Sequence, residues 1–295
     1  MRPSVTPDIA LVNMPYAQLA TPSVALGILK TCLTQEGLGA SVLNAQLLFA
    51  ERIGPGLYSF LIRGFPCLVG EWTFSNAAFP EFAPDNDKYV ARVARMLARE
   101  EPPAVVIEQL WETRAKAEQF VDELAAQILE ASPRIVACTS VFQQHCAALA
   151  LLRRVKELDP AVIALIGGSN CESEMGRTAL LNVPWLDVVV SGEADSLFAP
   201  LCQDLLAHGP GLPIEKLAEG VFAHQHRTRW SAGEELPVTR HVLNDMRGSP
   251  TPDYDDYYSN LETSPLNRAV SPGVPIETSR GCWWGQRKHC TFCGI

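Results

Sequence analysis

The sequence predicts an α/β protein built on a doubly wound parallel β-sheet. Short runs rich in Val and Ile alternate with segments of helical periodicity through the first 210 residues. The strands of a parallel sheet are buried on both faces, so their sequences are continuous apolar runs rather than alternating ones. Glycines and polar residues follow several of these runs, at the points where strands would end. Together these observations favour a parallel sheet that is covered by helices on both faces.

Five buried strands are expected in this region. The apolar runs lie at residues 9–12, 42–43, 134–140, 162–166 and 187–190. Apolar side chains at helical spacing follow the first, third and fifth runs, at residues 24–33, 149–158 and 197–205. Gly37 provides a stop for the first of these helices. The sequence therefore predicts a Rossmann-like domain over residues 1–210.

A long stretch without a convincing strand interrupts the alternation between about residues 50 and 132. It contains a Gly/Pro-rich and aromatic segment at 54–84, followed by apolar residues near helical spacing from Leu110 to Ile128. So long a segment between two strands is unusual in a compact domain and indicates an inserted element. The sequence predicts a helical insertion, which either packs against the sheet or covers a ligand.

The pattern changes after His208. Residues 221–230 are expected to form a hairpin, and residues 249–258, which contain two prolines, an extended connector. Residues 275–278 are expected to form the first strand of a second domain. The predicted organisation is a first domain at 1–210, a hairpin and Pro-rich connector at 211–270, and the start of a further domain at 271–295.

Composition narrows the classes of function. The chain is 47% hydrophobic and 19% charged, as folded proteins are, and its net charge of −9 argues against a general nucleic-acid binder. No signal-peptide pattern is evident, and no stretch approaches the roughly eighteen uncharged apolar residues of a membrane span. We therefore expect a cytoplasmic protein with neither nucleic acid nor membrane as partner. Scattered cysteines in apolar segments fit reduced, buried thiols better than a disulfide framework.

Polar residues and glycines collect where three of the predicted strands end. In an open parallel sheet, the ligand crevice lies beyond the carboxyl ends of the strands. The candidate ligand-binding residues are Thr139, Ser140, Val141, Phe142 and Gln143 after one strand, Gly167, Gly168, Ser169 and Asn170 after the next, and Gly192 and Glu193 after the last. Hydroxyl and amide groups can bond a polar ligand edge, and paired glycines admit a bulky ligand close to the backbone. A dinucleotide does not fit, because Asn13-Met-Pro-Tyr replaces the required G-x-G-x-x-G.

Three cysteines lie close together near residue 295. Two residues separate Cys290 from Cys293, and seven separate Cys282 from Cys290. Three thiolates with basic neighbours and no fourth cysteine favour an iron–sulfur cluster in which one iron lacks a protein ligand and can bind a substrate. A zinc knuckle that adds His289 to the three cysteines is the alternative.

These residues resemble a known family. The run Glu277-Thr-Ser-Arg-Gly-Cys-Trp-Trp-Gly with Cys290-Thr-Phe-Cys-Gly is similar to the cluster loop of radical S-adenosylmethionine enzymes. Most of that superfamily spaces its cysteines C-x3-C-x2-C, whereas the cobalamin-binding branch that matures ribosomally made peptides widens the first gap to seven. The resemblance implies that Cys282, Cys290 and Cys293 bind a [4Fe–4S] cluster. It also implies that a (β/α) barrel for S-adenosylmethionine begins within residues 271–295 and is truncated there.

The strand-end loops resemble the cobalamin-binding domain of the same branch. Ser140-x-Phe142 stands where such domains place a Ser-x-Leu element, and Gly167-Gly168 matches the glycine pair that admits the nucleotide tail of cobalamin. Glu71-Trp-Thr-Phe74 also resembles a segment of the family. The resemblance implies that the three loops hold cobalamin. The D-x-H-x-x-G motif is absent and residues 13–23 contain no histidine, so cobalt is expected to lack a histidine ligand from this loop.

The function that this resemblance implies is that of a cobalamin-dependent radical S-adenosylmethionine methyltransferase, of which the chain is the amino-terminal portion. Such an enzyme transfers methyl to an unactivated carbon of a ribosomally made peptide. The implied partners are the precursor peptide and an external electron donor. Two alternatives remain: a cobalamin-binding module without catalysis, and an enzyme with the same cofactors that oxidises or rearranges its substrate.

Overall fold

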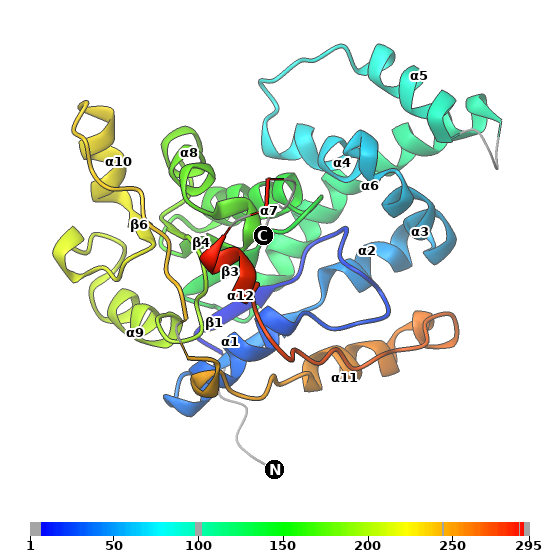
Figure 1. Cartoon of the computed structure of the whole chain (residues 1–295). Coiled ribbons are helices and arrows are strands. Elements are labelled where there is room, and N and C mark those ends of the chain that lie inside the picture. The colour runs from blue at the N-terminus through cyan, green and yellow to red at the C-terminus, as the bar shows by residue number, and fades with distance from the viewer. Residues whose placement is uncertain (1–6, 98–101, 244, 289, 292–295) are drawn as a thin grey trace.

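The computed structural model describes residues 7–97, 102–243, 245–288 and 290–291, and a six-stranded sheet lies at its centre (Figure 1). The strands are β1 (Ile9–Val12), β2 (Ala40–Leu43), β3 (Ile135–Thr139), β4 (Ile163–Gly167), β5 (Val188–Val190) and β6 (Val221–Ala223). Their order is β2-β1-β3-β4-β5-β6, with β1 to β5 parallel and β6 antiparallel to β5. The predicted α/β fold around a mostly parallel sheet is confirmed. The sheet extends past residue 210, where the sequence placed the end of the first domain.

Helices cover both faces of the sheet. Successive strand residues point to opposite faces, so Ile9 and Leu11 belong to one apolar cluster, while Ala10 and Val12 belong to the other. The first cluster contains residues of α1 (Val24–Gln35) and α9 (Phe198–His208). The second contains residues of α7 (His145–Leu158) and α8 (Glu174–Asn182), together with those of the insertion. This double covering explains why the strands are apolar throughout.

The stretch between β2 and β3 is helical, as predicted. It forms α2 (Ala45–Ile53), α3 (Pro55–Arg63), α4 (Val69–Ala78), α5 (Asn86–Leu97) and α6 (Pro103–Glu130), which gather on one side of the molecule in Figure 1. Trp72 of α4 stacks on Tyr89, with ring centroids 5.3 Å apart. The Arg114 guanidinium lies 4.5 Å from the centroid of the Trp72 ring. The Glu71 carboxylate accepts the backbone N–H groups of His145 and Cys146, at 3.1 and 2.7 Å, and so caps α7. Glu71 therefore ties the insertion to the sheet domain, while Trp72 packs the helices of the insertion together.

The predicted hairpin at 221–230 is wrong. After β6 the chain turns directly into α10 (His224–Ser231). Phe222, His226 and Trp230 recur every four residues and pack their rings together, 5.2 to 5.7 Å apart. Arg227, on another side of this helix, donates to the carbonyl oxygens of Leu180, Val183 and Leu186 at the end of α8 and just beyond it. These contacts stabilise a helix that the apolar pattern did not reveal.

The connector docks on the sheet domain. Its prolines precede α11 (Asp255–Thr263), a helix the sequence did not predict, so they do not interrupt it. The buried ammonium of Lys30 pairs with Asp253 at 3.1 Å and Asp256 at 2.9 Å. Asp256 also accepts the backbone N–H of Val42 at 2.7 Å, which satisfies a donor on the edge strand β2.

Residues 275–278, predicted as a strand, are not part of the sheet. Over the part of the chain that the structure describes they pair with no strand, and the short helix α12 (Trp283–Arg287) follows. The Tyr254 hydroxyl donates to the carbonyl oxygen of Pro275 at 3.1 Å, so this segment is held by the connector instead.

Within the described ranges, no helix is both long and apolar enough to cross a membrane.

Candidate ligand-binding site at the carboxyl ends of the strands

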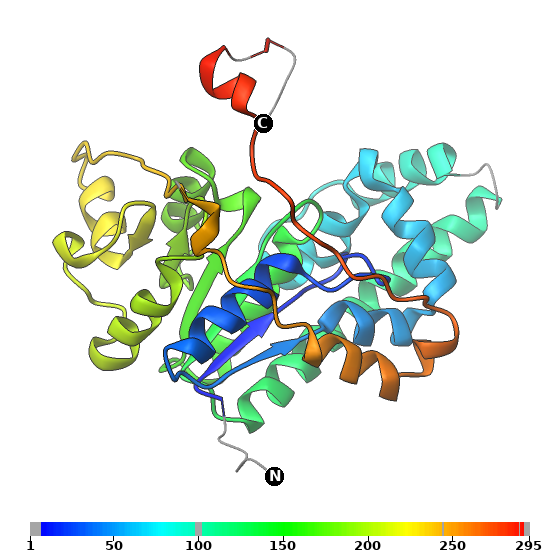
Figure 2. The same cartoon turned by 60° about the horizontal axis from the view of Figure 1, so that its bottom comes forward.

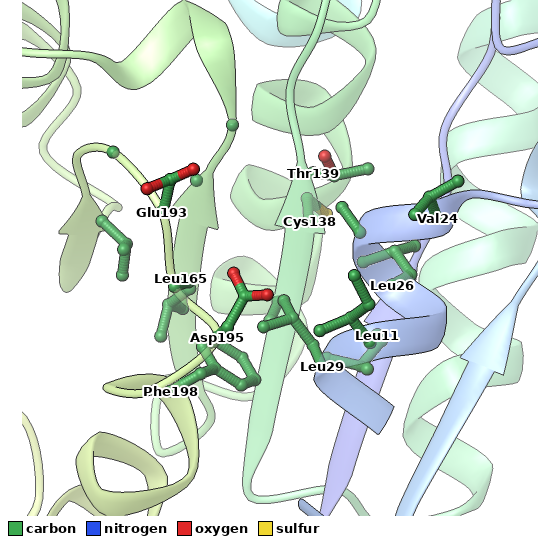
Figure 3. Close-up of a pocket in the computed structure, with 18 of the residues that line it drawn as sticks. Leu11, Val24, Leu26, Leu29, Cys138, Thr139, Leu165, Glu193, Asp195 and Phe198 are labelled. Carbon is green, nitrogen blue, oxygen red and sulfur yellow. The ribbon is translucent and has the colours of Figure 1, made fainter. Parts of the chain in front are cut away.

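A cavity of about 330 Å³ lies at the carboxyl ends of the strands, between the sheet and α1. Figure 3 shows Leu11 and Leu29 on one side of it and Leu165 and Phe198 on the other. Its polar side chains come from Thr139, from the loop after β5, and from Glu277 and Arg280. The strand order reverses between β1 and β3, and doubly wound sheets bind their ligands at such a reversal. This space is mostly apolar. We call it the tail cavity, after the nucleotide tail that the glycine pair Gly167-Gly168 is expected to admit.

A second and shallower cavity of about 430 Å³ adjoins the first, since Ala25 and Thr139 line both. We call it the outer cavity. It is formed by the loop after β1, by residues 141–144 and by Ile62 and Phe65 of the insertion. Phe65 and Phe142 are 54% and 56% exposed, and their ring centroids lie 6.2 Å apart. The insertion thus lines the candidate ligand site in addition to packing on the sheet.

The structure brings the predicted residues of all three loops to this edge of the sheet. The tail cavity is lined by Thr139, Gly167, Gly168, Gly192 and Glu193, and the outer cavity by Thr139, Val141, Phe142 and Gln143. Ser140, Ser169 and Asn170 are not among the residues that line either cavity. Direct contacts to a ligand would therefore come from the residues that line the tail cavity and the outer cavity.

Ser140 and Asn170 bond the loops to one another. Ser140 is fully buried, and its Oγ lies 2.8 Å from Nδ1 of His145. Asn170 donates from Nδ2 to Ser140 Oγ at 3.2 Å and to the carbonyl oxygen of Val141 at 2.7 Å. Burial lowers the pKa of His145, which favours its neutral imidazole. These side chains set the shape of the site from beneath.

Gln143 and Gln144 fix the neighbouring loops. Gln143 has a φ of +66°, and its Oε1 accepts the backbone N–H of Gly70 at 2.9 Å, which ties the loop after β3 to α4. Gln144 Nε2 donates to Asn13 Oδ1 at 3.0 Å and to the carbonyl oxygen of Met14 at 2.6 Å. Gln144 lines the outer cavity but was not among the predicted residues. In the sequence, only its position next to Gln143 pointed to a role for Gln144 in the site.

The two glycines after β4 have different requirements. Gly168 has a φ of +104°, and a Cβ there would lie 2.6 Å from the carbonyl oxygen of Ser140. A Cβ at Gly167 would be at ordinary contact distance, 3.4 Å from the carbonyl oxygen of Val190. Gly168 is thus required by the crossing of two loops, while Gly167 leaves space at the cavity wall.

We expect Gly168→Ala to lower the free energy of unfolding by at least about 2 kcal/mol, because it combines backbone strain with a clash. Gly167→Ala is the matched control and should change it by less than about 1 kcal/mol. Chemical denaturation of both variants measures the difference. Equal losses would show that the crossing of the loops does not depend on Gly168.

The loop after β5 carries an ion-pair network that the sequence did not reveal. Arg280 donates from both terminal nitrogens to the Asp195 carboxylate, at 2.8 Å each, and also bonds Glu277. Ser249 Oγ donates to Asp195 Oδ1 at 2.8 Å. Burial raises the pKa of the Asp195 carboxyl, but the hydrogen bonds from Arg280 and Ser249 outweigh burial and hold this pKa below its ordinary value. Asp195, Glu277 and Arg280 all line the tail cavity.

The predicted cluster residues are placed only in part. Cys282 is exposed and Cys290 half-buried, while Cys293 and His289 lie outside the described residues. In the portion of the chain described, no three His, Cys, Asp or Glu side chains are grouped to hold a metal ion. Iron–sulfur and zinc binding therefore both remain predictions. Arg280, two residues before Cys282, does tie this segment to the edge of the sheet.

Comparison with known proteins does not assign the chain to a family. No protein-family model matches the chain, and no curated protein matches it. The chemistry must be inferred from the site, which offers a deep apolar space, a wider half-polar space beside it, and an acidic network at the rim. Such a site suits one large ligand that has an apolar end and a broad body rich in hydrogen-bonding groups.

Proposed function

We propose that the chain is the amino-terminal, cobalamin-binding portion of a radical S-adenosylmethionine enzyme that methylates a ribosomally made peptide. The arrangement of the site carries the proposal: the tail cavity and the outer cavity adjoin at the β1/β3 reversal, and the cysteine-bearing segment is tied to the rim of the tail cavity. Cobalamin has matching parts, because a flat, apolar benzimidazole hangs by a phosphoribose tether from a broad corrin ring with amide side chains.

The residues present fit the two parts of this ligand. The apolar floor of the tail cavity, with Gly167 and Ala137 in its wall, suits a flat base that needs no charged partner. The outer cavity offers the amides of Asn13 and Gln18 and the exposed ring of Phe142 to a corrin and its side chains. Of the residues described, no histidine lines either cavity. The loop after β1 itself contains no histidine, so we propose that it gives cobalt no imidazole.

Cys282, Cys290 and Cys293 would hold a [4Fe–4S] cluster, and S-adenosylmethionine would occupy the iron that they leave open. Bound together, these groups supply a methyl group and the radical chemistry that activates a carbon. The task of the chain is to bind, orient and shield them. The exposed rings of Phe142 and Phe65 would cover a ligand in the outer cavity, and Arg280 ties the cysteine segment to the tail cavity. The remaining partners would be a precursor peptide and an external electron donor.

Retention of hydroxocobalamin tests the proposal. The purified chain, incubated with hydroxocobalamin and then desalted, is expected to keep about one equivalent, as one bipartite site implies. Visible absorbance measures the bound corrinoid, and bovine serum albumin carried through the same column gives the background. Retention no higher than this background would refute the proposed function.

A further inference from the structure

Residues 271–280 run from the connector to the mouth of the tail cavity. Figure 2 shows this segment leaving the region of α11 and crossing towards the carboxyl ends of the strands. On the way, the backbone N–H of Gly273 donates to the carbonyl oxygen of Ala20 at 2.7 Å, in the loop after β1. Glu277 and Arg280 then line the cavity itself. We call residues 271–280 the strap.

Polar contacts hold the strap in place. Its apolar side chains point away from the protein, since Val274 is 66% exposed and Ile276 is 81% exposed. Apolar burial therefore contributes little to keeping the strap closed. Its first part is held by single hydrogen bonds, from Tyr258 to the Gly273 carbonyl oxygen and from Tyr254 to that of Pro275, each 3.1 Å long.

The strongest contact of the strap is made by Arg280. Two parallel hydrogen bonds join its guanidinium to Asp195, whose side chain is only 8% exposed. Paired bonds between a guanidinium and a carboxylate fix both distance and orientation. Glu193, on the same loop, lies 3.6 Å from Arg280 and makes a weaker contact. Asp195 also keeps its hydrogen bond from Ser249, which limits the positions from which it can receive Arg280.

We propose that the strap is a closing element of the tail cavity and that the Asp195–Arg280 pair is its latch. Asp195 is then a positioning residue, which places the cysteine segment by fixing Arg280 two residues before Cys282. Opening the latch frees both the mouth of the cavity and the cysteine segment, so ligand release and cysteine placement are coupled. The latch itself follows from the ion pair, whereas its effect on corrinoid release rests on the proposed function.

Trypsin cleavage tests the latch directly. To cut the peptide bond between Arg280 and Gly281, the protease must bind the Arg280 side chain in its own pocket, and this side chain is held by Asp195 while the latch is closed. In Asp195→Asn, whose shape is unchanged but whose charge is lost, cleavage after Arg280 is expected to accelerate roughly tenfold. Mass spectrometry measures the rate of this cleavage and divides it by the rate of cleavage after Arg268, an exposed arginine in the same molecule. The matched control is Asp122→Asn, the same change at an aspartate that pairs with Arg154 and lines neither cavity, and it should leave the ratio of the two rates near that of the natural protein.

An unchanged ratio in Asp195→Asn would overturn the latch. If this substitution accelerated both cuts equally by loosening the whole fold, Arg280→Lys decides instead. That change lies on the strap, keeps a trypsin site and removes the paired bonds. A raised ratio in Arg280→Lys supports the latch, and an unraised one overturns it.

Release of hydroxocobalamin tests the coupling. We expect Asp195→Asn to release the bound corrinoid several-fold faster than the control Asp122→Asn, and we expect bound corrinoid to slow the cleavage after Arg280 in the natural protein. Equal release rates would overturn the coupling. If no variant bound the corrinoid at all, the proposed function would fail, and the trypsin ratio alone would decide the latch.

Discussion

Tryptophan in place of Ala25 is expected to abolish the retention of hydroxocobalamin while the protein stays folded. Ala25 is exposed on α1, yet it lines both the tail cavity and the outer cavity. An indole there would fill the passage that the tether of the nucleotide tail must cross. Burial of an aromatic base is worth about 3 kcal/mol, so its exclusion should weaken binding by roughly a hundredfold or more.

The control is Ala207→Trp, because Ala207 is another exposed alanine, on α9, and lines neither cavity. Equilibrium titration with hydroxocobalamin compares the two variants, and circular dichroism with thermal unfolding confirms that both are folded. Ala207→Trp should bind like the natural protein. Equal affinity of the two variants would show that cobalamin does not pass Ala25, and the assignment of the cavities would have to be abandoned.

Simultaneous replacement of Cys282, Cys290 and Cys293 by alanine is expected to remove all bound iron and sulfide. Reconstituted without oxygen, the natural chain should hold about four of each, the stoichiometry of a [4Fe–4S] cluster. Iron and sulfide analysis measures both quantities. Cys67→Ala is a suitable control, because Cys67 is a half-buried thiol in the insertion, outside the predicted cluster loop.

Two results would contradict this prediction. Iron that survived the triple replacement would have other ligands. Stoichiometric zinc without sulfide in the natural chain would favour the zinc knuckle, and the radical mechanism would have to be withdrawn.

The strands that the sequence predicted well are those buried on both faces. Residues of β3 and β4 are apolar almost throughout because helices cover both sides of them. The helices that the sequence missed are held by tertiary contacts. In α11 only Tyr257 and Leu261 are buried, and the charges that fix its start reach it from Lys30, more than two hundred residues away in the chain. In α10 a ring cluster, rather than a broad apolar stripe, marks the inner face.

The location of the candidate site was predictable, but the task of each side chain was not. Carboxyl ends of parallel strands share one edge, so the three polar loops had to meet there. A buried hydroxyl or amide must find a partner, however, and Ser140, Gln143 and Asn170 find theirs in neighbouring helices and loops. The Asp195–Arg280 pair joins residues 85 positions apart, a distance over which no sequence pattern acts.

The most direct test of the cobalamin site is a crystal structure of the chain grown with hydroxocobalamin. We expect the benzimidazole between Leu165 and α1, beside Gly167, and the corrin ring over the outer cavity next to Phe142. We also expect no histidine nitrogen from the loop after β1 on the cobalt. A corrinoid bound elsewhere on the protein, or a tail cavity that stays empty while the corrinoid binds, would contradict the account.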